Sequence, residues 1–295
     1  MFFIVGSARS GTTLLRLILS AHPEVAVPPE SRFITELYRT DEVEVDAFLS
    51  EIEGHKRFQV WELSVELVRA ELTGRTTVRY GEAVEAAYRA YAKSRGKTHY
   101  GDKTPRYIEH IPLLAKLFPT AKFVHQIRDG RNVALSYADV PFGPNTVGKA
   151  AALWGLRVAM GLRDGRALGP DRYHEIRYED FVKNAPEHTR KLCEFLGIGF
   201  TDQMLDHAER SRSDILPRAH LYNPNVSKPP TSNVRSWENQ MPDKQVEMFE
   251  AVAGDILDAT EYPRRYPQPS LTARVGAELS RLGLPVGRLE SSRAR

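Results

Sequence analysis

Cysteine is almost absent from this chain, which has a single thiol, Cys193, among 295 residues. One thiol cannot form an internal disulfide, so a small fold held together by disulfides is excluded. The sequence also lacks any spaced set of cysteine and histidine residues that would match a zinc site. Cys193 lies in the stretch 190–197, whose apolar residues have helical spacing. We therefore expect a buried structural thiol rather than a nucleophile.

Long apolar runs are missing as well. No stretch approaches the roughly 18 apolar residues of a membrane-spanning helix. The apolar segment that begins at Phe2 leaves no room for the charged and cleavable regions of a signal peptide. With Met1 as the natural start, we expect a cytoplasmic protein without a transmembrane segment.

An excess of charge of one sign is the third absence. The 41 basic residues are nearly matched by 38 acidic ones, which gives a net charge of +3. This balance argues against nucleic acid as a partner, although it suits a small anionic ligand. With 295 residues the chain can bury a sizeable core, as one large α/β domain or as two smaller ones.

The most informative stretch is the N-terminus. Four apolar residues, Phe2 to Val5, run into a loop bracketed by Gly6 and Gly11, and a dense apolar stripe follows from Leu14 to Leu19. This pattern predicts a buried strand, a tight loop and a helix. The free N–H groups and the positive dipole end of such a helix favour a bound phosphate or sulfate.

The two glycines have the spacing of a Walker A loop, but Thr12 stands where that loop has its lysine. The nearest cation is Arg9, whose planar guanidinium suits bidentate contact with a phosphate or sulfonate. A P-loop kinase of small molecules, with Asp102 or Asp129 as a Mg²⁺ ligand, is one interpretation, although the missing lysine counts against it. A non-catalytic nucleotide-binding module that recruits a partner is another.

Arg9-Ser10-Gly11-Thr12-Thr13 resembles the phosphosulfate loop of the PAPS-dependent sulfotransferases, [KR]-[ST]-G-T-[TS], in the arginine version of tyrosylprotein sulfotransferases and many bacterial relatives. PAPS is 3′-phosphoadenosine 5′-phosphosulfate. The resemblance implies an α/β, P-loop-like three-layer fold with a central parallel sheet flanked by helices. It also implies that these five residues bind the donor PAPS and that no metal is required.

Two further residues match the family's catalytic positions. The segment from His22 to Arg32 is similar to H-P-[ED]-V-x-x-x-x-E-[ST]-R, so the resemblance implies that Glu30 is the base for the acceptor hydroxyl. Lys103, in an Asp-Lys-Thr-Pro turn, matches the lysine that contacts the transferring sulfonate or the bridging oxygen. From the residues alone, Glu30 could equally be a solvated glutamate before a helix, and Lys103 an exposed loop lysine.

The second end of the donor is expected downstream. Arg128 and Ser136 have the spacing of the family's arginine and serine that hold the 3′-phosphate, and Tyr178 matches the tyrosine near the adenine. A tyrosine that only fills core space would look identical. The stretch Thr231–Trp237 resembles a basic family segment, in which Arg235 replaces the usual small residue or serine and is a candidate phosphate ligand.

The resemblance covers roughly residues 2–265. We predict a sulfotransferase domain over 1–267, with a helical insertion at 41–96 that lines the acceptor site, and an amphipathic helix and tail over 268–295. The apolar face of that helix packs internally, on a second subunit in a homodimer, or on a membrane surface. The predicted function is transfer of sulfonate from PAPS to a small-molecule, lipid-linked, carbohydrate or peptidyl hydroxyl.

Overall fold

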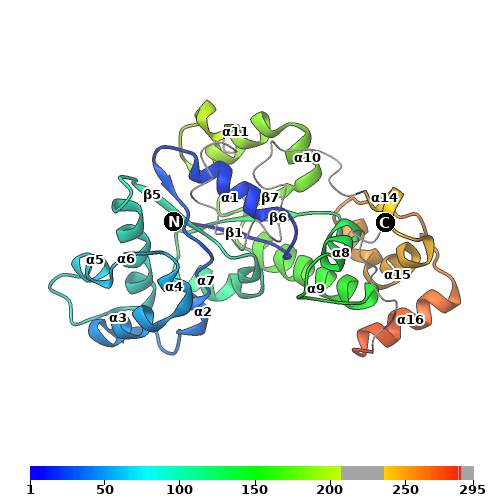
Figure 1. The fold of residues 1–295 in the computed structure, drawn as a ribbon, viewed down its shortest axis with the longest axis horizontal. Helices are drawn as coiled ribbons and strands as arrows, with labels where there is room; N and C mark the ends of the chain where they lie inside the picture. Colours follow the sequence, from blue (N-terminus) through cyan, green and yellow to red (C-terminus); the bar gives the residue numbers. More distant parts are fainter. Residues whose placement is uncertain (207–235, 285, 287–295) are drawn as a thin grey trace.

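A five-stranded parallel sheet forms the centre of the molecule (Figure 1). The computed structural model describes residues 1–206, 236–284 and 286. The strands have the order β2-β5-β1-β6-β7, with all neighbours parallel. They are β1 (Phe2–Val5), β2 (Val25–Ala26), β5 (His99–Lys103), β6 (Lys122–Ile127) and β7 (Tyr173–Arg177).

Both faces of the sheet are buried, which explains the uninterrupted apolar run of β1. Phe3 and Val5 point into one core with α3 (Val45–Gly54) and α6 (Tyr80–Lys93). Phe2 and Ile4 point into the opposite core with α1 (Thr12–Ser20) and α11 (Ala185–Leu196). Successive side chains of a strand alternate between faces, so one apolar run serves two layers of helices. The predicted three-layer α/β fold is confirmed.

The sheet brings three loops to one edge. β1 lies between β5 and β6, with Ile4 opposite Lys103 and Val5 opposite His125. Because the strands are parallel, the loops after β1, β5 and β6 all start at the same side of the sheet. Ligands of open α/β sheets bind at these carboxyl ends.

A third apolar core lies beside the sheet and is built mainly from helices, together with Ile127 at the end of β6. It is formed by α8 (Gly130–Ala138), α9 (Val147–Arg166), α14 (Trp237–Gln240) and α15 (Asp243–Ala259), on the right in Figure 1. The expected C-terminal helix is α16 (Leu271–Arg281), which packs on α9 and α15. Its buried side carries small residues, whereas its aliphatic side chains are exposed: Leu271, Val275, Leu279 and Leu282. The domain boundary at 267 stays a prediction.

The expectation that 40–96 is helical was partly wrong. β3 (Glu42–Glu44) and β4 (Thr77–Arg79) pair as a small antiparallel sheet, with Val43 opposite Val78. Three residues are too few for a period of two to stand out against the neighbouring helical spacing. The rest of the region is helical, with α3, α4 (Lys56–Gln59), α5 (Val65–Ala70) and α6.

The remaining elements are short connections: α2 (Phe33–Glu36), η1 (Pro105–His110), α7 (Ile111–Leu117), α10 (Tyr178–Lys183) and η2 (Asp202–Met204). Cys193 on α11 is buried, as predicted, and burial raises the pKa of its thiol to about 11. None of the helices in the described ranges has the length and apolar content needed to cross a bilayer.

Candidate active site

The loop after β1, residues 6–11, has a backbone suited to bind an anion, and we call this loop the cradle. Gly11 (φ 88°) and Arg9 (φ 73°) both adopt the left-handed region, which turns the chain sharply before α1 begins at Thr12. The first N–H groups of α1 are therefore directed at the loop, where they and the helix dipole favour an anion. A left-handed arginine is unusual, and such backbone strain is common at functional sites.

Glycine is required at position 11 for a second reason. A Cβ atom there would overlap the ring of Tyr178, which comes from the start of α10 and lies against the loop. The guanidinium of Arg128 lies over the same ring, 4.4 Å from its centroid. Tyr178 therefore joins the loop after β1 to the loop after β6.

The predicted residues of the two donor ends meet. Arg9 Nε donates to Ser136 Oγ at 2.8 Å, across 127 positions of sequence. Arg128 Nη1 donates to the carbonyl oxygen of Arg9 at 3.4 Å. Asp129 caps α8 by accepting from the backbone N–H of Arg131. Two guanidiniums and a hydroxyl thus lie beside the cradle.

Several buried polar atoms around the cradle have no protein partner. They are Ser10 Oγ, Arg128 Nε and both amide atoms of Gln126. Gln126 is fully buried on β6, and its Nε2 lies 3.3 Å from the position that a Gly11 Cβ would take. Unpaired buried polar groups are rare in proteins, so this set fits a polar ligand at the loop. Gln126 was not among the predicted site residues; it is a buried amide that lies between His125 and Ile127 at the end of β6.

The second part of the site is an ion pair. Lys103 Nζ, at the end of β5, donates to Glu30 Oε1 at 2.7 Å, and Arg32 lies 3.7 Å from the other carboxylate oxygen. Burial alone would raise the pKa of Glu30, but the charge and hydrogen bond of Lys103, with Arg32 and Arg57, lower it below its usual range. The Glu30 carboxylate is thus ionised at neutral pH and partly open to solvent, as a base requires.

The insertion at 41–96 contacts the segment that carries Glu30. Trp61 Nε1 donates to the carbonyl oxygen of Pro29 at 2.8 Å. Tyr80 Oη donates to the carbonyl oxygens of Phe33 and Ile34 at 3.1 and 3.0 Å. The aromatic side chains that looked like ordinary core residues therefore support the backbone on both sides of Glu30.

The two aspartates of the kinase interpretation are both engaged. Asp102 is fully buried, accepts from Tyr88 Oη at 2.6 Å, and has its pKa raised to about 6 by burial. Asp129 binds the Arg131 guanidinium through both oxygens, at 3.0 and 2.7 Å. Because both carboxylates already have protein partners, this interpretation is not favoured.

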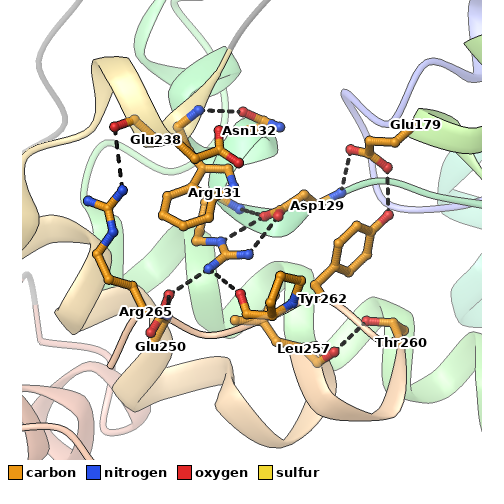
Figure 2. Close-up of polar contacts among 12 residues, drawn as sticks. Asp129, Arg131, Asn132, Glu179, Glu238, Glu250, Leu257, Thr260, Tyr262 and Arg265 are labelled. Atoms are coloured by element: carbon orange, nitrogen blue, oxygen red, sulfur yellow. Dashed lines mark hydrogen bonds and ion pairs between the residues drawn. The ribbon is translucent and has the colours of Figure 1, made fainter. Parts of the chain in front are cut away.

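Behind the cradle lies a buried charge network, centred on Arg131 (Figure 2). Besides Asp129, the Arg131 guanidinium binds Glu250 Oε1 of α15 at 2.5 Å and the Pro263 carbonyl oxygen at 2.9 Å. Glu179 accepts from the Asp129 backbone N–H at 3.1 Å and from Tyr262 Oη at 2.7 Å. We call these four ionisable residues, Asp129, Arg131, Glu179 and Glu250, the charge network.

The segment expected to carry a phosphate ligand is only partly described. Arg235 lies outside the described residues. Trp237, two positions later, is anchored on α8: its backbone N–H donates to Asn132 Oδ1 at 2.9 Å, and the Arg131 guanidinium lies 3.6 Å from its ring centroid. The tryptophan that the sequence singled out therefore packs against the helix that carries Ser136.

Comparisons with known proteins agree with this geometry. The family model described as "Sulfotransferase family" matches residues 2–202, and "Sulfotransferase domain" matches 162–261. The first range holds the cradle, Glu30, Lys103, Arg128 and Ser136.

The curated relatives include protein-tyrosine sulfotransferases of animals and a nodulation protein of a bacterium. The chain is 27% identical to protein-tyrosine sulfotransferase A of Caenorhabditis elegans, over 90% of this chain and 70% of that protein. It is 27% identical to the protein-tyrosine sulfotransferase of Drosophila melanogaster, over 82% of this chain and 48% of that one. It is 26% identical to nodulation protein NoeE of Sinorhizobium fredii, over 87% of this chain and 63% of that one.

Solved structures share the fold. The sulfotransferase domain of a Synechococcus olefin synthase has a TM-score of 0.57 and 22% identity, over 80% of this chain and 89% of that one. The sulfotransferase domain from the curacin biosynthetic pathway has a TM-score of 0.54 and 18% identity, over 97% and 98% of the two chains.

Proposed function

This chain belongs to the sulfotransferase family, whose model matches residues 2–202, and on this premise we propose that it transfers a sulfonate group from PAPS to an acceptor hydroxyl. The observation that carries the proposal is the meeting of Arg9 with Ser136 at 2.8 Å, beside a cradle whose edge also holds the Lys103–Glu30 pair. PAPS has a 3′-phosphate at one end and a 5′-phosphosulfate at the other, so its binding site needs two groups of positively charged side chains close together.

In this proposal the loop N–H groups, Ser10, Gly11, Thr12 and Thr13 hold the 5′-phosphosulfate, because the left-handed turn at Gly11 directs the start of α1 at the loop. Arg128 and Ser136 hold the 3′-phosphate. Arg9 contacts both loops and adds positive potential between them. Tyr178, beside Gly11 and Arg128, is placed to contact the adenine.

The reaction is a single displacement at sulfur. Glu30 takes the proton of the acceptor hydroxyl while the acceptor oxygen forms a bond to sulfur. The bond between sulfur and the bridging phosphate oxygen breaks, and its electron pair stays on the departing 3′,5′-ADP. Lys103 and Arg9 stabilise the negative charge that develops on that oxygen and on the sulfonate oxygens. The products are a sulfate ester and 3′,5′-ADP.

The acceptor is a hydroxyl of a small molecule, a lipid-linked group, a carbohydrate or a peptide. Relatives named protein-tyrosine sulfotransferases favour the screening of tyrosine peptides first, and NoeE favours the inclusion of non-peptide acceptors. The cytoplasm stays the predicted compartment, and imaging of the tagged full-length chain tests it.

The first test is donor binding and transfer. We expect 3′,5′-ADP to raise the melting temperature without added metal, and MgATP to leave it unchanged. Labelled sulfonate from PAPS is then expected on an acceptor of the screened panel. Stabilisation by MgATP alone would favour the kinase interpretation, and donor binding without transfer to any class of hydroxyl would favour the non-catalytic module.

The second test addresses the base. Glu30→Gln should lower turnover by about 10²–10⁴-fold, because the amide cannot take the proton. Affinity for 3′,5′-ADP should stay the same, since the cradle and Arg128 are untouched. Glu36→Gln is the matched control: Glu36 lies in the same segment but is exposed and paired with His55 at 2.9 Å. Equal turnover of wild type and Glu30→Gln would remove Glu30 as the base.

A further inference from the structure

The segment that carries Glu30 and the turn that carries Lys103 are joined by more than their ion pair. The residue after Glu30 is bonded to the residue after Lys103: Ser31 backbone N–H donates to Thr104 Oγ1 at 3.2 Å. Tyr107 Oη lies 2.8 Å from Ser31 Oγ and accepts from the Ile34 backbone N–H at 3.2 Å. We call Ser31, Thr104 and Tyr107 the hydroxyl clasp.

The clasp is buried, and so is Lys103, whereas the Glu30 side chain is partly exposed. Ser31, Thr104 and Tyr107 are at most 2% exposed, but 26% of the Glu30 side chain is accessible. Hydrogen bonds between short, buried side chains and backbone allow little movement. The clasp also lies next to the two proposed catalytic residues. Ser31 follows Glu30 in the chain, Thr104 follows Lys103, and Tyr107 lies one turn of η1 after Thr104.

The ion pair alone would not fix the position of the base. Lysine is a point charge on a flexible four-carbon stem, so it holds a carboxylate at a distance without setting its direction. A catalytic group must be held to within about 0.5 Å by a rigid supporting shell. In the described part of this site the clasp supplies direct bonds between the two segments, 73 to 76 positions apart in sequence.

We propose that Thr104 and Tyr107 are positioning residues for sulfonate transfer, which hold the Glu30 carboxylate in register with Lys103. This inference rests on the proposed function. Neither residue contacts the reacting atoms; each acts through Ser31 on the backbone of Glu30. Their hydroxyls are therefore expected to matter for the state of the base, and not for the grip on the donor nucleotide.

The charges around Glu30 make the position of its carboxylate measurable through its pKa. Lys103 from β5, Arg32 before α2 and Arg57 from α4 lower the pKa of Glu30, against the effect of burial, while Asp102 is the buried carboxyl nearby. If the clasp is loosened, the carboxylate moves from Lys103 and its pKa rises. The loss of a purely structural hydrogen bond elsewhere would lower stability without this shift.

The experiment uses the full chain with ¹³C-labelled glutamate and follows the Glu30 carboxyl carbon by NMR as pH changes, with the signal identified by its loss in Glu30→Gln. Tyr107→Phe and Thr104→Val remove one hydroxyl each and keep nearly the same volume. Tyr100→Phe is the control, because its hydroxyl donates to Glu85 at 2.9 Å and does not touch the clasp. Thr104→Ser restores a hydroxyl.

We expect an upward pKa shift of Glu30 in Tyr107→Phe and Thr104→Val, none in Tyr100→Phe, and recovery in Thr104→Ser. With PAPS and a tyrosine peptide or 4-nitrophenol as acceptor probe, kcat should fall by about 10–100-fold, as for a small misplacement of a catalytic group. The dissociation constant for 3′,5′-ADP should stay within twofold of wild type.

An unchanged Glu30 pKa in both clasp variants, with a lower melting temperature, would overturn the proposal and make the clasp structural only. A fall in 3′,5′-ADP affinity that matches the fall in kcat would also overturn it, since the clasp would then act on the donor. The NMR titration needs no transfer. Failure of the proposed function, seen as no transfer by wild type, is thus distinguished from failure of the clasp.

Discussion

The two halves of the site are supported by opposite kinds of chemistry. Around Glu30 the supporting groups are hydroxyls and aromatic rings, from Tyr107, Trp61 and Tyr80. Around Arg128 the support is ionic: the Arg131 guanidinium, with no exposed surface, binds the carboxylates of Asp129 and Glu250. The proposed base thus rests on neutral hydrogen bonds. Arg128 and Ser136, the proposed 3′-phosphate ligands that we call the phosphate arm, rest on the charge network.

This difference has a physical reason. In the proposed function Arg128 and Ser136 hold a dianionic phosphate, which Asp129, the cap of α8, would repel if its charge were not neutralised by Arg131. Around Glu30 the functional charges are already paired with each other, so neutral support leaves their balance undisturbed. Loss of one partner should therefore cost far more in the ionic half than in the neutral half.

The largest expected effect comes from Arg131→Met. It leaves the buried Asp129 and Glu250 carboxylates without their shared partner, and breaking a buried ion pair from one side costs about 3–5 kcal/mol. Urea unfolding measures the loss. The control is Arg163→Met: Arg163 pairs with Asp164 at 2.7 Å, but its side chain is 71% exposed. Exposed pairs contribute at most about 1 kcal/mol.

A loss in Arg131→Met no larger than that in Arg163→Met would remove the distinction between the two halves. The charge network would then be a set of contacts without mutual dependence. Adding 3′,5′-ADP to Arg131→Met sharpens the result. If the nucleotide stabilises this variant less than it stabilises wild type, the charge network supports nucleotide binding by the phosphate arm.

Asp102 is the exception in the neutral half, and it gives the second prediction. Burial raises the pKa of this carboxyl from 3.8 to about 6, so the folded protein binds a proton that the unfolded chain has released. Its contribution to stability is present below about pH 4 and is lost as pH rises through about 6. Asp102→Asn should therefore be more stable than wild type by about 2–3 kcal/mol at pH 8, and similar to it at pH 4.

Denaturant unfolding at the two pH values tests this. Glu85→Gln is the matched control, since Glu85 also accepts from a tyrosine, Tyr100, but is half-exposed. It removes a carboxylate that accepts from a tyrosine but is less deeply buried than Asp102. A stability difference between Asp102→Asn and wild type that stays flat with pH would show that the buried carboxylate carries no cost.

Sequence patterns predicted the elements that depend on neighbouring residues. The strand, loop and helix of 2–19 and the turn at Lys103 follow from local apolar spacing and turn chemistry. Contacts between distant segments could not be read in this way. Arg131 was not among the predicted site residues, and its partner Glu250 lies 119 positions away. Likewise, a role for the Gln126 amide at the cradle can be inferred only from the structure, in which its Nε2 lies 3.3 Å from the Cβ position of Gly11.

The smallest expected effect concerns Gly11 in the cradle, and it separates the steric clash of an added Cβ atom from the backbone strain of a positive φ. Gly11 and Gly96 both have positive φ, 88° and 66°, so alanine at either position carries the left-handed penalty of about 1–2 kcal/mol. Nothing lies within 4 Å of a Cβ at Gly96, whereas a Cβ at Gly11 meets the Tyr178 ring. Both variants should lose similar stability from strain, but only Gly11→Ala displaces Tyr178.

Gly11→Ala should therefore weaken 3′,5′-ADP binding about tenfold, which corresponds to about 1.4 kcal/mol. Gly96→Ala should bind the nucleotide as wild type does, by isothermal titration calorimetry. Gly11→Ala combined with Tyr178→Ala tests the role of the ring. If Gly11→Ala no longer weakens 3′,5′-ADP binding when Tyr178 is alanine, the clash with the ring causes the loss of affinity. If Gly11→Ala binds like Gly96→Ala, the ring yields without cost, and only the backbone and the two guanidiniums define the cradle.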